Sequence, residues 1–222
     1  MPARPRRRRG RGKGRTPSPT YREEDALLRE GYSLLGGLDE VGRGPLAGPV
    51  VAAVVVFPSR PAGKWTELIR DSKQITPTQR ERVLPYLQDH AVGLEVGISS
   101  SLEIDRIGIV GATRLAMKRA IDSLALRPQF LLIDALTLPD VPIPQKAIIH
   151  GDALCLSIAA ASIAAKVARD RIMAEEDVIN PGYGFAGHKG YGTAEHIRNL
   201  RRLGPCPIHR YSFAPVRELA GR

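Results

Sequence analysis

The sequence predicts a single α/β domain built from five strands with helices between them. Short apolar runs bounded by glycine, proline or polar residues recur along the chain, and segments with helical periodicity separate them. A chain of 222 residues with 43% hydrophobic residues can form one sizeable core and leaves little room for a second. The predicted strands are residues 34–41, 49–57, 91–99, 130–134 and 145–150.

The predicted strands differ in how they are buried. Residues 34–41 form an apolar strand with two glycines inside it, and residues 91–99 alternate as a half-buried strand does. Residues 130–134 form a continuous apolar run that ends in Asp134. Such a run is typical of a buried parallel strand whose last residue reaches an active-site edge.

Three helices are predicted between and after these strands. One runs from residue 77 to about residue 88 and has a proline near its start, where proline is tolerated. A second covers residues 101–126 and is interrupted by two glycines. The third, at 157–170, is apolar almost all round and should pack against the sheet. We expect its last turn, with Arg169, to be solvated and to hold a local ion pair.

The formal charge of +10 is concentrated at the N-terminus. Residues 1–15 contain eight Lys or Arg residues and no acidic residue, which leaves about +2 for the rest of the chain. This segment cannot bury much apolar surface, so we assign residues 1–25 to a disordered basic tail and residues 26–222 to the folded domain. The tail either binds nucleic acid phosphates without sequence preference or is a dispensable solubilising extension.

The composition argues against a secreted or membrane protein. The basic tail lacks the apolar segment of a secretory signal, and the longest apolar run, residues 50–57, is too short to cross a bilayer. Two cysteines agree with a reducing compartment, and we expect neither a disulfide nor a zinc site. We therefore expect a cytoplasmic protein without membrane association.

The segment at 37–49, GLDEVGRGPLAGP, carries the clearest functional signal. Asp39 and Glu40 supply the hard oxygen ligands that Mg²⁺ or Mn²⁺ prefers. Arg43 lies between two glycines, which let the backbone turn tightly and approach a ligand. Its guanidinium and the amides around it can hold a phosphate. The alternative is an ordinary turn with an acidic pair on the surface.

Two further acidic residues follow predicted strands. Asp134 ends the strand at 130–134, and Asp152 follows the strand at 145–150. Three strand ends that carry acidic residues at one edge of a sheet can hold two cations roughly 4 Å apart, as two-metal phosphoryl chemistry requires. Asp152 can instead be the N-cap of the helix that follows it.

The segment at 181–193, PGYGFAGHKGYGT, combines five glycines with aromatic rings, a histidine and a lysine. No regular element is expected there. Aromatic rings beside cations on a loop suit stacking on sugars or bases and contacts with phosphates. The alternative is an ordered loop whose tyrosines cover the core.

Together these motifs resemble those of ribonuclease HII, the type 2 ribonuclease H family. The resemblance runs from about Leu35 to Pro215, and both the order and the spacing of the motifs fit, which makes chance similarity implausible. The matching segments are GLDEVGRGPLAGP at 37–49, DSK at 71–73, EID at 103–105, ID at 133–134, GDA at 151–153, AAASIAAKVARD at 159–170, HKGYGT at 188–193 and HRYSF at 209–213.

The resemblance implies a ribonuclease-H-like fold, with a five-stranded mixed sheet flanked by helices and a helical C-terminal extension. It implies an endonuclease that hydrolyses the RNA strand of RNA–DNA hybrids and cuts 5′ of ribonucleotides embedded in duplex DNA. Its products would carry 5′-phosphate and 3′-hydroxyl ends. We expect these nucleic acids as partners and a monomeric protein. The alternatives are a non-catalytic nucleic-acid-binding protein and a DNA nuclease or resolvase of the same superfamily.

By the same resemblance, four residues correspond to the family's catalytic carboxylates, which bind two Mg²⁺ or Mn²⁺ ions: Asp39, Glu40, Asp134 and Asp152. Neighbouring strand residues point to opposite faces, so the first two can both reach metal only if the strand ends or twists there. Ala135 also departs from the family, which most often has glycine at that position. Together with three prolines in residues 136–144, it alters the expected cleft beside the acid but removes no ligand.

The resemblance also assigns the substrate contacts. Backbone groups of Gly42-Arg43-Gly44 correspond to the motif that contacts the ribose 2′-hydroxyl, the group that separates RNA from DNA. Tyr191 corresponds to the residue that stacks under the sugar beyond the cut, with Tyr183 as the alternative. Lys73 corresponds to a phosphate contact, with a surface lysine in a turn as the alternative.

Overall fold

A computed structural model describes residues 18–70, 72 and 75–221. Its centre is one sheet with the strand order β3-β2-β1-β4-β5. The pairs β1–β2 and β2–β3 are antiparallel, whereas β1–β4 and β4–β5 are parallel, so the sheet is mixed as expected. The strands are β1 (Leu35–Val41), β2 (Val50–Phe57), β3 (Gly93–Ser99), β4 (Phe130–Asp134) and β5 (Gln145–Ile148).

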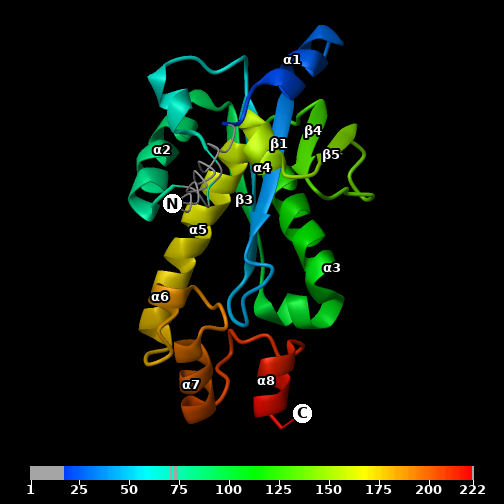
Figure 1. Ribbon diagram of the computed structural model, residues 1–222. Helices are drawn as coiled ribbons and strands as arrows, with labels where there is room; N and C mark the ends of the chain where they lie inside the picture. The colour runs from blue at the N-terminus through cyan, green and yellow to red at the C-terminus, as the bar shows by residue number, and fades with distance from the viewer. Residues whose placement is uncertain (1–17, 71, 73–74, 222) are drawn as a thin grey trace, which may run out of the picture.

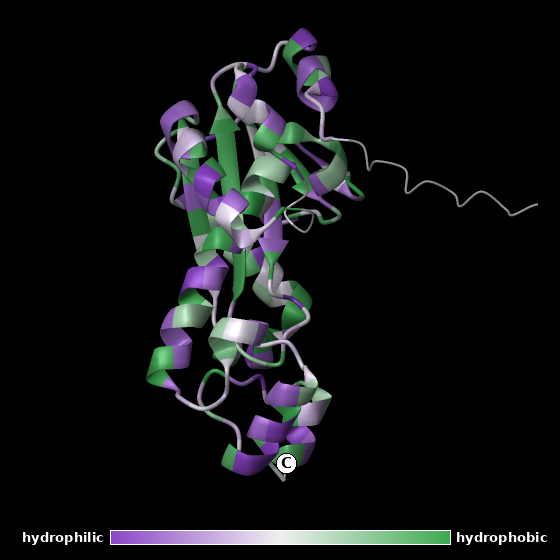
Figure 2. Ribbon diagram, turned by 60° about the vertical axis from the view of Figure 1, so that its left-hand side comes forward, coloured by the Kyte–Doolittle hydropathy of each residue, from purple (hydrophilic) through white to green (hydrophobic). Residues whose placement is uncertain are grey.

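Helices cover both faces of this sheet (Figure 1). Helix α5 packs against β1 and β2, with α2 beside it, and α3 packs against the other face. Every residue of β2 is buried, and in Figure 2 the strands are mainly hydrophobic, whereas the helices contain both hydrophilic and hydrophobic residues. The helices are α1 (Arg22–Arg29), η1 (Lys64–Leu68), α2 (Pro77–His90), α3 (Ser101–Asp122), α4 (Gly151–Leu154), α5 (Leu156–Ile179), α6 (Phe185–His188), α7 (Ala194–Leu203) and α8 (Ala214–Leu219).

The predicted elements match the observed ones to within a few residues, apart from one helix. Helix α3 is interrupted as expected, but only at Gly108, whose φ of +73° is not helical. Helix α5 is longer than predicted, and a separate turn, α4, precedes it. Cys155 between them is extended because Thr20 pairs with the backbone on either side of it, through Thr20 N to Leu154 O and Leu156 N to Thr20 O.

The folded part of the chain begins before residue 26, within the basic tail predicted at residues 1–25. Tyr21 is buried, and the fully buried Glu24 accepts hydrogen bonds from the Cys155 thiol and, at 2.9 Å, from Ser157 N. Its carboxylate therefore caps the first turn of α5 from far away in the sequence. Residues 1–17 lie outside the described residues. Within the described residues, no helix is long and apolar enough to span a membrane.

The expected C-terminal extension is helical and lies beyond the end of the sheet where β1 stops (Figure 1). Its interior contains a buried histidine pair, in which His196 Nε2 and His209 Nε2 are 3.1 Å apart. Cys206 N donates to His209 Nδ1 at 2.9 Å. Burial, followed by the neighbouring His196, lowers the pKa of His209 to about 4. His209 is therefore neutral in the folded protein at neutral pH.

Acid should destabilise the protein through His209. The unfolded state takes up a proton near pH 6.5, whereas the folded state does so only near pH 4, so stability falls as the pH drops between these values. One site of this kind contributes roughly 3 kcal/mol at most. The free energy of unfolding, measured in urea at pH 7 and pH 4.5, should fall less in His209→Asn, whose amide oxygen can replace the Nδ1 acceptor. An equal fall in both proteins would contradict the assignment.

Candidate active site

Strands β1 and β4 bring three of the expected acidic residues to one edge of the sheet. The two strands are parallel neighbours, and Leu38 pairs with Ile133. Asp39 and Asp134 directly follow this pair, so both lie at the same level of the sheet. Glu40 is the next residue of β1. The expected juxtaposition therefore follows from parallel pairing and register.

The charges of these acids act on one another. Burial, and then the charge of Glu40, raises the pKa of Asp39 well above its ordinary value, although the Ser162 hydroxyl partly opposes the shift. Burial also raises the pKa of Glu40, against the opposing effect of Arg43. The charge of Asp134 raises the pKa of both groups. Such carboxylates are costly to keep ionised together without a cation.

Strand β1 ends at Val41, directly after the adjacent acids Asp39 and Glu40. Asp39 is buried on the α5 side, where Ser162 contacts it, and Glu40 accepts a hydrogen bond from Arg43 Nη1 at 3.2 Å. Gly42 follows with a φ of +93°, which turns the backbone away from the sheet. Both acids are thus close enough for Asp134 to affect them although they point to opposite faces. One oxygen of Glu40, Oε2, is buried without a hydrogen-bond partner among the described residues.

Asp152 lies next to this group but is not a helix N-cap. It is buried within α4, whose N-cap is His150, while α5 has Cys155 as its N-cap. The N-cap alternative from the sequence is therefore wrong. Gly151 N donates to Asp134 Oδ1 at 2.8 Å, which joins the start of α4 to the end of β4.

A hard divalent cation fits these groups. The unpartnered Glu40 Oε2 and the raised pKa values of Asp39 and Glu40 are both conditions that a cation would relieve. In the part of the chain that the structure describes, no three His, Cys, Asp or Glu side chains are gathered tightly enough to enclose an ion. An ion bound here would therefore need water or substrate phosphate to complete its set of ligands, and Mg²⁺ commonly takes both.

The expected substrate loops lie against each other beside the acids. A Cβ built on Gly44 would be 3.8 Å from Tyr191 Cε1. Tyr191 is 46% exposed, whereas Tyr183 is 6% exposed, stacks on Phe185 and donates its hydroxyl to Gly204 O. The glycine-rich segment therefore has one tyrosine in the core and one at the surface beside the loop after β1. It also contains one helical turn, α6, although no regular element is expected there from the sequence.

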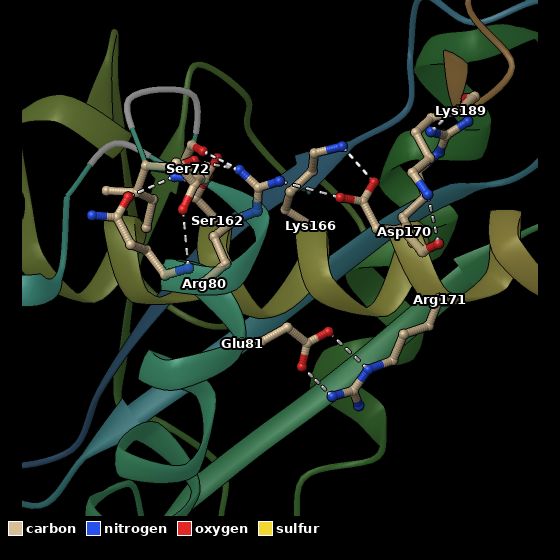
Figure 3. A network of polar contacts seen from close by, with 12 residues as sticks. Ser72, Arg80, Glu81, Ser162, Lys166, Asp170, Arg171 and Lys189 are labelled. Atoms are coloured by element: carbon tan, nitrogen blue, oxygen red, sulfur yellow. Dashed lines mark hydrogen bonds and ion pairs between the residues drawn. The ribbon is translucent and has the colours of Figure 1, made fainter. Parts of the chain in front are cut away.

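Lys73 lies outside the described residues, but its neighbour Ser72 is firmly held (Figure 3). The hydroxyls of Ser72 and Ser162 are 2.8 Å apart, and Arg80 Nη1 donates to Ser72 O at 2.7 Å. Because Ser162 also contacts Asp39, helix α5 connects Ser72 with the acidic group.

Two buried arginines are not predicted from the sequence. Lys166 and Asp170 form the expected ion pair on α5, shown in Figure 3. Arg169, however, is fully buried rather than solvated, and it donates to the backbone carbonyls of Pro49, Ala47 and Lys189. Arg210 is also fully buried. The only sequence signal is their position inside family-like motifs, because a charged residue normally predicts exposure.

Ala135, the departure noted beside Asp134, is in a strained conformation. Its φ of +52° lies in the left-handed region, which costs an ordinary residue about 1 kcal/mol and glycine almost nothing. Ala135→Gly should therefore raise the free energy of unfolding by about 0.5–1 kcal/mol. Urea denaturation measures this, and Ala153→Gly inside helix α4 is the control, which should be destabilised. If Ala135→Gly is destabilised as Ala153→Gly is, the backbone of Ala135 is not strained.

The arrangement of the fold and of its acidic edge defines a protein of the ribonuclease H type. Ribonuclease H2 from Pyrococcus horikoshii OT3 has a similar structure, with a TM-score of 0.70 and 26% identity over 85% of this chain and 98% of that chain. Ribonuclease HIII from Bst, solved in complex with Mn²⁺, shares the fold at a TM-score of 0.62 and 21% identity, over 85% of this chain and 69% of that chain.

The family follows from the sequence comparisons. The family model described as ribonuclease HII matches residues 36–216. Ribonuclease HII of Dehalococcoides mccartyi is 51% identical over 201 residues, which cover 90% of this chain and 95% of the relative. That of Desulfitobacterium hafniense is 54% identical over 200 residues, or 89% of this chain and 75% of the relative. The chain belongs to the ribonuclease HII family and is thus an endonuclease that hydrolyses phosphodiester bonds.

Proposed function

We propose that this endonuclease is metal-dependent, hydrolyses the RNA strand of RNA–DNA hybrids and cuts 5′ of ribonucleotides embedded in duplex DNA, with 5′-phosphate and 3′-hydroxyl products. The main support is the proximity of Asp39, Glu40 and Asp134 beside the Gly42–Gly44 loop. Carboxylates beside a phosphate-binding loop repel the substrate unless cations are bound between them.

Asp39, Glu40, Asp134 and Asp152 would hold two Mg²⁺ or Mn²⁺ ions. The chemistry that these ions supply is activation of the attacking water and stabilisation of charge on the leaving 3′ oxygen. The protein keeps the ligands oriented: the Ser162 hydroxyl contacts Asp39, and Gly151 N donates to Asp134. Ligands fixed in this way need little rearrangement to bind cations.

The substrate would lie over the loop after β1. Backbone groups of Gly42, Arg43 and Gly44 would contact the 2′-hydroxyl of the ribose on the 3′ side of the cut, and Tyr191 would stack on the next sugar. The exposure of Tyr191 and its position beside Gly44 support Tyr191 as the stacking residue over the buried Tyr183. The Arg43 guanidinium, now paired with Glu40, is half-exposed and can reach a phosphate.

Other contacts would extend this interface. Lys73 would bind a phosphate next to the turn that Ser72 anchors. The basic segment at 1–15 would add contacts that weaken as salt rises. We infer that the protein acts as a monomer in the cytoplasm.

The test is cleavage of an end-labelled DNA duplex that contains one ribonucleotide, beside an all-DNA duplex and an RNA–DNA hybrid, with Mg²⁺ or Mn²⁺ and with chelator. Metal-dependent cutting of the hybrid, and of the mixed duplex 5′ of its ribonucleotide, would support the proposal if the DNA duplex stays intact. Cutting of all-DNA duplex would instead indicate a DNA nuclease of the same superfamily. Cleavage unaffected by chelator would exclude the metal-dependent chemistry.

A further inference from the structure

Arg210 makes an unusual set of contacts beneath the loop after β1. Its fully buried guanidinium donates to Gly42 O at 2.5 Å and to Arg43 O at 2.9 Å. It also donates twice to Gly48 O, through Nε at 3.0 Å and Nη2 at 2.8 Å. No ion pair among the described residues includes Arg210. Its buried charge is thus compensated mainly by loop carbonyls, and desolvation makes such an arrangement costly unless the hydrogen bonds are retained.

These contacts determine where the loop amides point. In a trans peptide the C=O of one residue and the N–H of the next point in opposite directions, and the described chain has no cis peptide bond. Because Gly42 O and Arg43 O face Arg210, the N–H groups of Arg43 and Gly44 face the other way. Neither N–H has an acceptor among the described residues, and Gly44 is exposed. Two donors are therefore left for a ligand.

Arg169 holds the other end of the same loop. It donates to Pro49 O at 2.9 Å and to Ala47 O at 3.2 Å, while its third contact, at 3.0 Å, is to Lys189 O. Lys189 begins the turn that leads to Tyr191. Gly42 is needed here because a Cβ at this residue would lie 2.2 Å from Arg169 Nε. Arg169 thus links the loop to the segment that carries the exposed tyrosine.

We propose that Arg210 and Arg169 are positioning residues for ribose recognition, which hold the loop carbonyls inward and so present the Arg43 and Gly44 amides to the 2′-hydroxyl. This inference rests on the proposed function. The contacts of both arginines are to other groups of the protein. The loop that they hold is the segment that would distinguish ribose from deoxyribose. Their removal should reduce this discrimination more than general affinity for duplexes.

Arg210→Lys tests the proposal, because an ammonium is a compact charge that cannot replace the planar fork of a guanidinium. The readout is the ratio of the Kd for all-DNA duplex to the Kd for the same duplex with one ribonucleotide, measured with chelator to prevent cutting. We expect this ratio to fall about tenfold in the variant, as the loss of one or two oriented hydrogen bonds predicts, with affinity for all-DNA duplex little changed.

A stability control separates positioning from general damage. Leu124→Ala removes a buried side chain that packs against Gly93, away from the loop, and should lower the unfolding temperature but keep the ratio. Phe213→Leu removes the ring that the Arg210 guanidinium covers at 5.1 Å and should lower the ratio by a smaller factor. This variant serves as the test if Arg210→Lys does not fold.

The outcomes distinguish this inference from the proposed function. If the wild-type protein has no preference for the ribonucleotide, the ribose-reading function and the positioning role are both wrong. If it has the preference and folded Arg210→Lys keeps it, only the positioning role is wrong. If Arg210→Lys does not fold and Phe213→Leu keeps the wild-type ratio, the positioning role is also wrong. If Leu124→Ala lowers the ratio of the two Kd values as much as Arg210→Lys does, the effect comes from reduced stability and the positioning role is wrong.

Discussion

Asp134→Asn should reduce the cleavage rate about 10³-fold or more while duplex binding stays nearly unchanged. Asp134 ends β4 beside β1, and its charge acts on both Asp39 and Glu40. The amide keeps the shape of the carboxylate but removes the charge and one strong oxygen ligand. The geometry of the strands should survive, so the loss should appear in kcat rather than in duplex affinity. Single-turnover cleavage and a binding titration with chelator measure the two quantities.

Stability provides an independent check on the same variant. Removal of the Asp134 charge relieves the repulsion that raises the pKa values of Asp39 and Glu40, so without metal the unfolding temperature should be at or above that of wild type. Added Mn²⁺ should raise the unfolding temperature of wild type more than that of the variant. Asp140→Asn, on an exposed turn, is the matched control and should change neither property. Near-normal cleavage by Asp134→Asn would remove this residue from the catalytic group.

Much of the sheet is predictable because its signals are local. A strand such as β4 is a continuous apolar run, and its last residue is the acid. Parallel pairing then brings Asp134 beside Asp39 without any further information. Periodicity therefore predicts the strands and their acidic ends, whereas the strand order that places the two acids side by side comes from the structure.

Contacts between distant segments are not predictable in this way. The sequence around Asp152 is compatible with one helix that starts there, but pairing of Thr20 with Leu154 and Leu156 splits it into two. Arg169 and Arg210 likewise have the composition of surface residues. They are buried because the backbone carbonyls of a loop more than 100 residues away provide their acceptors.

A large effect on stability is expected at a glycine in β1. Gly37 lies two residues before Asp39, on the same face of the strand, where α5 approaches the backbone closely. A Cβ at Gly37 would lie 2.2 Å from the Ser157 carbonyl carbon and 2.5 Å from its oxygen. No real structure allows such contacts, so α5 would have to move. This close approach brings Ser162, five residues further along α5, into reach of Asp39.

Gly37→Ala should therefore lower the free energy of unfolding by about 3 kcal/mol, at the upper end for overpacking, which corresponds to roughly 6–12 °C in unfolding temperature. Gly36→Ala is the matched control. Its Cβ would meet only side chains, Leu131 Cδ2 at 3.0 Å and Pro128 carbons at 3.3 Å, which can shift. We expect a loss below about 1.5 kcal/mol there.

Cleavage by Gly37→Ala should also fall at temperatures where the variant remains folded, because displacement of α5 moves Ser162 away from Asp39. The activity of Gly36→Ala should stay near wild type. Equal stability of the two variants in urea would show that α5 does not depend on the missing side chain. If Gly37→Ala is unstable but fully active when folded, Asp39 does not require the position of α5, and β1 alone orients it.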